Sequence, residues 1–300
     1  MGTSVRAERR RPRLGSGPPG RDAAGSRRPG LLGARGARAT RRARGPALVA
    51  GVGLVALLTA GCTVPVAFDL FGRTTTSGWG SATVGGSWTQ VKGSPSEVSV
   101  DGTGGVFAIP AGNYLSAEQI MTLPATSVRD YTATFTVSFT ENINTINPKY
   151  GGVVAYMVAR YQNTSATGYY RLGIVWDAGT RRLWLRTQNA AGKGAASNWT
   201  IEQNTGIDPV KDYPAGGPYA YTVAVQISGA FPTTFKSKVW KVGATAPAGW
   251  MLTGTDPGNL GPQAAGPVGV RASNDLQTSA STYPAFTEHI KVGDVSVTSP

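Results

Sequence analysis

The stretch YTATFTVSF, from Tyr131 to Phe139, alternates two kinds of side chain with a period of two. Its odd-numbered positions carry Tyr, Ala, Phe, Val and Phe, and its even-numbered positions carry Thr or Ser. Successive side chains of a β-strand point to opposite faces, so the pattern predicts a strand with one apolar face and one hydroxyl-bearing face. Such a strand covers a core with one side and meets water with the other, as in an antiparallel sheet.

Other stretches show the same alternation, or a short apolar run between turn residues. Examples are YTVAVQI at 221–227 and YRLGIVW at 170–176. We expect strands over residues 66–71, 87–91, 96–101, 105–109, 129–139, 152–162, 168–177, 181–188, 219–228, 234–242, 267–273 and 285–298. At most one helical turn is expected, in SAEQIM at 116–121. So many strands with so little helix predict an all-β chain, folded as a two-sheet antiparallel sandwich.

The formal net charge of +13 is concentrated near the start of the chain. Residues 1–46 hold 13 of the 29 Lys and Arg residues and two of the 16 acidic ones, whereas the chain from Cys62 onward holds 16 basic and 14 acidic residues. A segment rich in Arg, Gly and Pro cannot bury enough apolar surface to fold, so 1–46 is expected to be disordered. The remainder is nearly neutral, which removes the charge argument for a nucleic-acid partner.

An uncharged run, PALVAGVGLVALLTAG at 46–61, follows the basic RRAR at 41–44 and precedes the only cysteine. A basic flank, an apolar core and small residues are the parts of a secretory signal, and the run is short for a membrane span of about 20 residues. Its end, LTAGC at 58–62, resembles the lipobox of bacterial lipoproteins, with Thr59 where Leu is more usual. The resemblance implies cleavage before Cys62 and a lipid on its thiol. An uncleaved anchor and ordinary secretion are the alternatives.

These features predict four parts of the chain. They are a disordered Arg-rich segment at 1–46, a lipoprotein signal region at 47–61, a short lipidated tether at 62–67 and a β-sandwich at 68–300. The expected location is extracytoplasmic, with the protein anchored to the bacterial cell membrane by lipid. A single cysteine excludes an internal disulfide, so the sandwich depends on the packing of its core.

The stretch FDLFGRTTTSGWGSATVGGSWT, at 68–89, resembles the opening of a sandwich module of secreted actinobacterial proteins and of the tail proteins of their phages. Later stretches agree with it, among them GPVGVRAS at 266–273 and VGDVSV at 292–297. The module is similar to the concanavalin A-like lectin/glucanase jelly rolls, which include laminin G-like domains. The resemblance implies carbohydrate or surface binding and no defined reaction.

The same opening stretch has a physical interpretation. Four glycines are expected at turns with positive φ, where a residue without Cβ is favoured: Gly78, Gly80, Gly85 and Gly86. Its two large indoles, Trp79 and Trp88, are expected to build the fold and not a binding site.

No catalytic motif is present in the sequence. Glucanases of the related fold use Glu-x-Asp-x-x-Glu on one strand, and none of the glutamates after Cys62 has an Asp two residues on. The single histidine, His289, lies on an expected strand. The first hypothesis is therefore a non-catalytic protein that binds glycan or another envelope component. The alternatives are a structural or protein-interaction module, and a polysaccharide hydrolase or lyase built from scattered carboxylates.

One candidate binding surface comes from residues 153–188, which we expect to form three antiparallel strands. If Leu172 and Trp176 face the core, pairing Trp176 with Leu183 places Gly173 opposite Arg186, where the missing side chain leaves a gap. The outward residues are then aromatic and basic: Tyr156, Arg160, Arg171, Trp184 and Arg186. Aromatic faces and guanidinium groups suit sugar rings and carboxylates, which predicts a glycan site. A solvated face with Arg stacked on Trp is the alternative.

No cofactor is required by any of these features. A structural calcium ion is a further expectation, because the first and last strands are expected to pair and would bring Asp69 near Asp294. Calcium takes six to eight oxygen ligands, so two carboxylates do not complete a site. The expected partners are the membrane, through the lipid on Cys62, and a glycan or another envelope component, with no nucleic acid.

Overall fold

The computed structural model describes residues 63–110, 118–139, 152–162, 168–177, 180–190, 200–256, 261–275 and 287–300. They belong to one compact unit, residues 53–300. The Arg-rich segment, the apolar run and Cys62 lie outside the described residues, so the expectations for them stay predictions.

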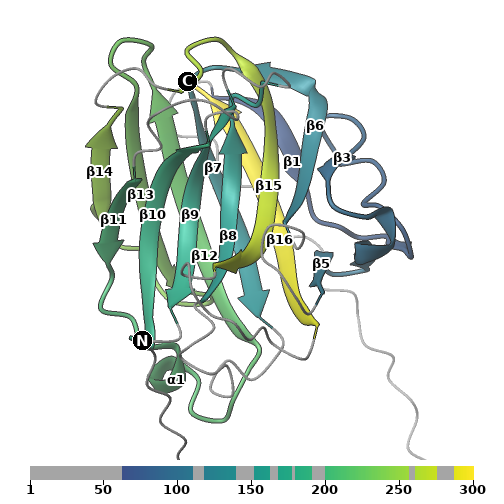
Figure 1. Cartoon of the computed structure of the whole chain (residues 1–300), viewed down its shortest axis with the longest axis vertical. Coiled ribbons are helices and arrows are strands. Elements are labelled where there is room, and N and C mark those ends of the chain that lie inside the picture. The colour runs from purple at the N-terminus through teal and green to yellow at the C-terminus, as the bar shows by residue number, and fades with distance from the viewer. Residues whose placement is uncertain are drawn as a thin grey trace, which may run out of the picture. The chain divides into compact units, whose positions relative to one another are not determined.

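Two antiparallel sheets pack face to face in this unit (Figure 1). The nine-stranded sheet has the order β14-β13-β12-β7-β16-β5-β4-β2, with β1 also paired to β16. Its strands are β1 (Val64–Asp69), β2 (Thr74–Thr75), β4 (Val98–Asp101), β5 (Gly105–Ile109), β7 (Tyr131–Phe139), β12 (Tyr219–Ser228), β13 (Thr234–Lys241), β14 (Leu252–Thr255) and β16 (Glu288–Ser299).

The seven-stranded sheet has the order β11-β10-β9-β8-β15-β6-β3. Its strands are β3 (Thr89–Lys92), β6 (Gln119–Val128), β8 (Gly152–Ala159), β9 (Tyr169–Asp177), β10 (Arg182–Ala190), β11 (Thr200–Asn204) and β15 (Gly266–Asp275). The described residues contain only two short helical turns, Pro95–Glu97 and α1 (Pro209–Asp212). The predicted all-β jelly-roll sandwich is confirmed.

The stretch YTATFTVSF forms β7, in the middle of the nine-stranded sheet between β12 and β16. Its odd-numbered side chains are buried and its even-numbered ones are half-buried, as the alternation predicts. The apolar side chains of β9 and β12, predicted to face inward, join them in one hydrophobic core between the sheets. The core is therefore built from the period-two pattern of each strand.

Strand β6 was not among the expected strands, and residues 119–121 of the predicted helical turn belong to it. It pairs with β15 as well as β3, and the pairing with β15 shifts between Gly266 and Val268. Pro124 lies in this irregular part and is exposed, so its missing N–H costs no ladder hydrogen bond. Because Pro124 interrupts the pattern, the sequence alone did not indicate a strand.

Strand β1 begins at Val64, only two residues after Cys62. Most of the tether expected at 62–67 is therefore part of the sheet. The remaining link from Cys62 to the sandwich spans at most about 7 Å when extended, instead of the roughly 20 Å of a six-residue tether.

The opening stretch builds the fold, as predicted. Its four glycines all have positive φ, between 68° and 108°. Trp79 and Trp88 are buried with ring centroids 5.0 Å apart, and Trp79 also contacts Phe71 at 5.2 Å and Phe107 at 4.6 Å. These rings fill the sandwich beside β1 and are not available to a ligand.

Candidate functional site

The pairing predicted for the second hairpin of 153–188 is the one in the structure. Trp176 lies opposite Leu183, so Val175 faces Trp184 and Gly173 faces Arg186. Strand β8 lies on the other side of β9, with Tyr156 opposite Gly173. The side chains predicted to point away from the core on β8, β9 and β10 therefore share the outer face of the seven-stranded sheet.

Tyr156 lies at the centre of this face, flanked by basic side chains. The guanidinium carbon of Arg171, on β9, is 5.8 Å from the centre of the Tyr156 ring, and that of Arg271, on β15, is 5.5 Å from it. Arg186 Nη1, on β10, donates to the Tyr156 hydroxyl at 3.5 Å. We call Tyr156, Arg171, Trp184, Arg186 and Arg271 the arginine–aromatic face.

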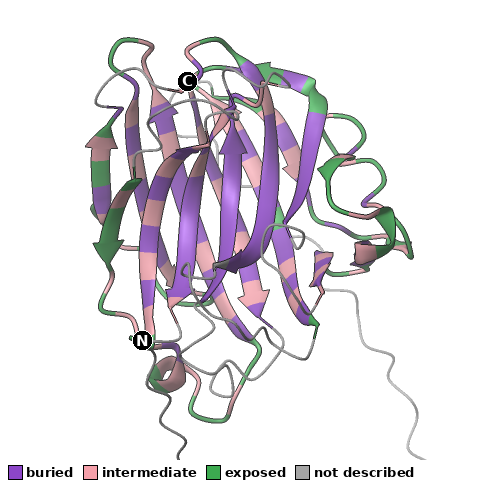
Figure 2. Cartoon of the chain, in the orientation of Figure 1, coloured by how far each residue is buried: buried purple, intermediate pink, exposed green. Residues whose placement is uncertain are grey.

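The arginine–aromatic face is largely buried. Strand β8 is buried at all eight positions, on both sides of the sheet (Figure 2). Val154, Tyr156 and Val175 form a second hydrophobic cluster on the outer side, and Trp184 packs against it. Trp184 and Arg171 are half-buried, although the alternation of their strands predicts an outward surface position for both. The most open part of the face is therefore the half-buried rim formed by Arg171, Trp184 and Arg186.

Two of the three arginines have acidic partners. Arg186 pairs with Glu202 on β11, and Arg271 pairs with Glu118, the residue before β6. Arg171 differs, because its Nε atom is buried with no hydrogen-bond partner in the part of the chain that the structure describes. Burial and the nearby charge of Arg271 both lower the pKa of Arg171. Since arginine stays charged in proteins, the face carries a cation whose Nε donor is unpaired among the described residues.

Glu118 accepts hydrogen bonds from side chains of three strands, β3, β9 and β15, at the edge of this face. It accepts hydrogen bonds from Lys92 and Arg271, and from the Tyr169 hydroxyl at 3.1 Å. Burial alone raises the pKa of Glu118, but the charge of Arg271 and the bonds from Lys92 and Arg271 outweigh it and lower the pKa from 4.5 to about 2. Burial is also the main reason that the pKa of Tyr169 rises to about 12.

The low pKa of Glu118 predicts a loss of stability in acid. A carboxyl group whose pKa is depressed by folding stabilises the fold fully above its unfolded-state pKa near 4.5, and the contribution fades as the pH falls toward the folded-state value near 2. The excess stability of the native protein over Glu118→Gln, about 3 kcal/mol at most, should hold above pH 5 and shrink between pH 4.5 and 2. Urea unfolding of both proteins across this range measures it. A constant difference would contradict the ion-pair network.

Gly173 does not leave a gap, in contrast to the prediction. A Cβ atom added there would lie 2.2 Å from the carbonyl oxygen of Ala155 and 2.8 Å from Cα of Tyr156. The glycine instead lets the backbones of β8 and β9 approach each other closely under the arginine–aromatic face.

Arg160 is not on the outer face, and its assignment to the glycan site is wrong. It follows the last residue of β8 with a φ of 52°, which breaks the alternation of the strand. Its side chain is 0% exposed and crosses the end of the sandwich. Its guanidinium donates to the carbonyl oxygens of Arg129, Gly229 and Pro262, to Thr233 Oγ1 and to Asp130 Oδ1, at 2.6 to 3.2 Å. A left-handed residue at a strand end cannot be recognised from alternation alone.

Arg271 belongs to the face but was not predicted. The inward positions Val268, Val270 and Ala272 already imply that Arg271 points outward from β15. The sequence does not indicate, however, that β15 lies beside β8, more than 100 residues earlier in the chain. His289 lies on the nine-stranded sheet, opposite Ala108 and away from this face, which the sequence also does not indicate.

The two residues predicted as calcium ligands lie in different environments. Strands β1 and β16 pair as expected, with Asp69 opposite Val295. Asp69 is buried and accepts two bonds from Arg73 at 2.8 Å, one from Trp88 Nε1 at 2.7 Å and one from the Phe71 amide at 2.9 Å. Asp294 is exposed. Within the described residues, no group of three or more His, Cys, Asp or Glu side chains could hold a metal ion.

Cys62, the predicted lipid attachment site, lies outside the described residues. In the part of the chain that the structure places, no helix combines the length and apolar character of a membrane-spanning segment.

No protein-family model matches the sequence, and no curated protein sequence matches it. Solved structures with a similar chain path include the alginate lyase Aly36B, with a TM-score of 0.49, 11% identity and coverage of 78% of this chain and 97% of that one. A Bacillus licheniformis β-glucanase has a TM-score of 0.47 and 13% identity, with coverage of 81% of this chain and 100% of that one. The CBM2 module of the evolved Dit protein of Lactobacillus casei BL23 phage J-1 has a TM-score of 0.44 and 13% identity, with coverage of 79% of this chain and 95% of that one. Similarity this distant does not transfer an activity, and the fold assignment depends on the two sheets themselves.

Proposed function

We propose that this chain is a lipid-anchored protein of the bacterial cell envelope, located outside the cytoplasm. Its sandwich binds a glycan that carries carboxylate groups, and the glycan contacts the arginine–aromatic face. The lipid is attached to Cys62, and the sandwich itself has no catalytic role.

The observation that carries the glycan proposal is Arg171. A buried donor without an acceptor costs on the order of 1–3 kcal/mol, so such a group needs a reason to be kept. A guanidinium group binds a carboxylate through two parallel hydrogen bonds. Trp184 lies on the same face of β10, four residues along the strand from Gln188, the partner of Arg171, and is therefore roughly 13 Å from the level of Arg171. Its half-buried indole offers an aromatic surface of the kind on which sugar rings stack. A uronate-containing glycan supplies both the carboxylate and the ring.

Two titratable groups at the edge of the face, Glu118 and Tyr169, favour binding over catalysis. A general acid or base works best with a pKa near the operating pH. Glu118 has its pKa lowered to about 2, and Tyr169 has its pKa raised to about 12. Neither group is therefore poised to exchange a proton near neutral pH, which argues against the hydrolase or lyase alternative.

Replacing Cys62 with serine is expected to release the protein from the membrane. The substitution removes the only thiol that can accept a lipid, and anchoring by acyl chains depends on that bond. Fractionation of cells that express the native protein or Cys62→Ser measures the effect. Unchanged pelleting of the mutant with the membrane would identify the apolar run at 46–61 as the anchor.

Replacing Arg171 with alanine is expected to weaken binding to uronate oligosaccharides about 10- to 100-fold, because a charge-assisted contact of about 1–3 kcal/mol is lost. The measurement is calorimetric titration of the detergent-solubilised lipoprotein with an oligosaccharide series. The same oligosaccharides with their carboxylates reduced to alcohols should bind the native protein as weakly as they bind Arg171→Ala.

Arg182→Ala is the matched control for this experiment. Arg182 lies on the same sheet, but it already pairs with Asp208 at 3.1 Å. Its replacement should leave binding within about twofold of the native value. Equal losses for Arg171→Ala and Arg182→Ala would contradict the proposed site, and the release of shorter or unsaturated products from a polymer would identify an enzyme.

A further inference from the structure

One end of the sandwich gathers several loops around the start of β1. Val64 lies opposite Ser299, Thr298 opposite Thr132, and Thr132 opposite Gln226, so the chain order across this end is β1, β16, β7 and β12. The loop from β12 to β13, at 229–233, therefore lies about 15 Å across the sheet from Val64, at three strand spacings. Figure 1 shows this end of the sandwich at the top, next to the C-terminus.

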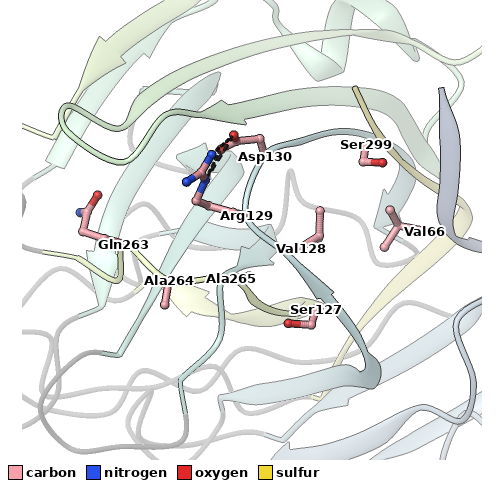
Figure 3. Close-up of a pocket in the computed structure, with 9 residues that line it drawn as sticks. All are labelled: Val66, Ser127, Val128, Arg129, Asp130, Gln263, Ala264, Ala265 and Ser299. Carbon is pink, nitrogen blue, oxygen red and sulfur yellow. Dashed lines mark hydrogen bonds and ion pairs between the residues drawn. The ribbon is translucent and has the colours of Figure 1, made fainter. Parts of the chain in front are cut away.

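An open pocket lies at the same end (Figure 3). Val66 and Ser299 line it on one side, and Arg129, Asp130 and Gln263 line it on the other. Arg129 has a side chain that is 50% exposed and pairs with Asp130 at 2.9 Å. Among the described residues of these loops, Arg129 is the one ionisable side chain with substantial exposure. The Asp130 carboxylate is paired with both Arg129 and Arg160, so the described residues of these loops present little unpaired negative charge to an anionic surface.

Phe231 is 73% exposed at the tip of the 229–233 loop, more than any other large apolar side chain in the described part of the chain. The loop that carries it is well held. The Gly229 amide donates to Asp130 at 3.0 Å, its carbonyl accepts from Arg160 at 2.6 Å, and Thr233 donates to Gln263 at 2.9 Å. Val64 is 59% exposed at the same end. A fixed loop thus presents an aromatic ring to the surroundings.

We propose that this end of the sandwich rests on the lipid bilayer, with Phe231 in the headgroup region and Arg129 toward anionic headgroups. The inference rests on the lipidation of Cys62 proposed above. A link of two residues, at most about 7 Å long, holds Val64 within reach of the bilayer surface. Aromatic side chains are favoured at the membrane–water interface, and a cation gains further attraction there.

This placement of the sandwich on the bilayer fixes the height and direction of the arginine–aromatic face. The strands would stand upright on the membrane, and Tyr156 lies three residues from the end of β8 at Ala159. The centre of the arginine–aromatic face would then lie roughly 10 Å beyond the membrane-facing strand ends, at about 3.3 Å per residue. The face would look sideways, toward glycan that runs close to the bilayer surface.

The single native cysteine makes a direct test possible. Once Cys62 carries its lipid, a cysteine introduced elsewhere is the only free thiol. Full-length lipoprotein with Phe231→Cys or Ala230→Cys is spin-labelled and reconstituted into vesicles of phosphatidylglycerol and phosphatidylethanolamine. Val242→Cys is the matched control, because Val242 is 43% exposed at the opposite end of β13. Electron paramagnetic resonance then compares collisions of each label with oxygen and with a water-soluble nickel chelate.

The labels at 230 and 231 should collide with oxygen severalfold more often, relative to the nickel chelate, than the label at 242. Mass spectrometry of the same preparations reports the lipid on Cys62. Acylated Cys62 with equal collision ratios at all three positions overturns the placement and leaves the anchor intact. Unmodified Cys62 in membrane-derived protein overturns the anchor and the placement together.

Discussion

Replacing Trp176 with alanine is expected to lower the free energy of unfolding by about 3–5 kcal/mol. Trp176 is 1% exposed and lies in the core between Val153 on β8 and Leu183 on β10. Its removal leaves a cavity that the two packed sheets cannot close. Its indole N–H is buried with no hydrogen-bond partner among the described residues, so within that part of the chain the loss is one of packing. Urea unfolding followed by circular dichroism measures the change.

Trp184→Ala is the control for this prediction. Trp184 comes from the same hairpin and faces the other side of the sheet, where it is half-buried against Val154, Tyr156 and Val175. Its indole N–H donates to Thr180 Oγ1 at 3.3 Å, a weak exposed bond. The expected loss is about 1 kcal/mol. If Trp184→Ala unfolded the protein while Trp176→Ala were tolerated, the hairpin would be shifted by one residue and the arginine–aromatic face would be wrong.

Arg160→Met is the second substitution with a large expected effect, again about 3–5 kcal/mol of unfolding free energy. The native guanidinium joins the 129–130 turn, the 229–233 loop and the segment at Pro262. Methionine keeps much of the volume but donates no hydrogen bond. The substitution therefore leaves buried carbonyl oxygens and the Asp130 carboxylate without their donor, and each unsatisfied buried acceptor lowers the free energy of unfolding.

Arg129→Met is the control that shows whether the stability lost in Arg160→Met comes from the buried hydrogen bonds or from the ion pair with Asp130. Arg129 pairs with the same Asp130 carboxylate, but its side chain is half exposed, so its replacement should cost at most about 1 kcal/mol. Thermal and urea unfolding of the two variants gives the comparison. Equal losses would show that the ion pairs with Asp130, and not the buried hydrogen bonds of Arg160, hold this end together. Because Arg160 lies away from the arginine–aromatic face, a folded Arg160→Met protein should bind glycan normally.

Several features of the chain could be predicted because they depend on neighbours in the sequence. The period-two pattern of YTATFTVSF identified β7 and its buried face, and the same pattern in 170–186 agrees with the observed pairing of Trp176 with Leu183. The positive φ values in the opening stretch follow from glycine itself. Alternation and turn chemistry act over a few residues, so one strand or hairpin contains all the information that they need.

The candidate site was predicted only in part, because it depends on contacts between distant segments. Tyr156, Arg171, Trp184 and Arg186 come from two consecutive hairpins and were placed on the correct face. Arg271 joins them only because β15 lies beside β8, and Glu118 only because β6 lies beside β15. The absence of a partner for the Arg171 Nε atom among the described residues is likewise a result of packing, which no local pattern encodes.

Arg160 shows where the local pattern gives the wrong site residue, and Asp69 shows that strand pairing alone does not indicate the partners of a side chain. Alternation placed Arg160 outside, but one left-handed φ turned its side chain into the end of the sandwich, where three segments supply its acceptors. Strand pairing brought Asp69 beside the backbone of the last strand, but Arg73 and Trp88 take up its carboxylate. The sequence by itself therefore determined most of the long strands and their buried faces. The order of the strands, and with it the partner of each buried charge, was decided by the tertiary structure, because a buried charge must find its partner wherever the packed sheets bring one within reach.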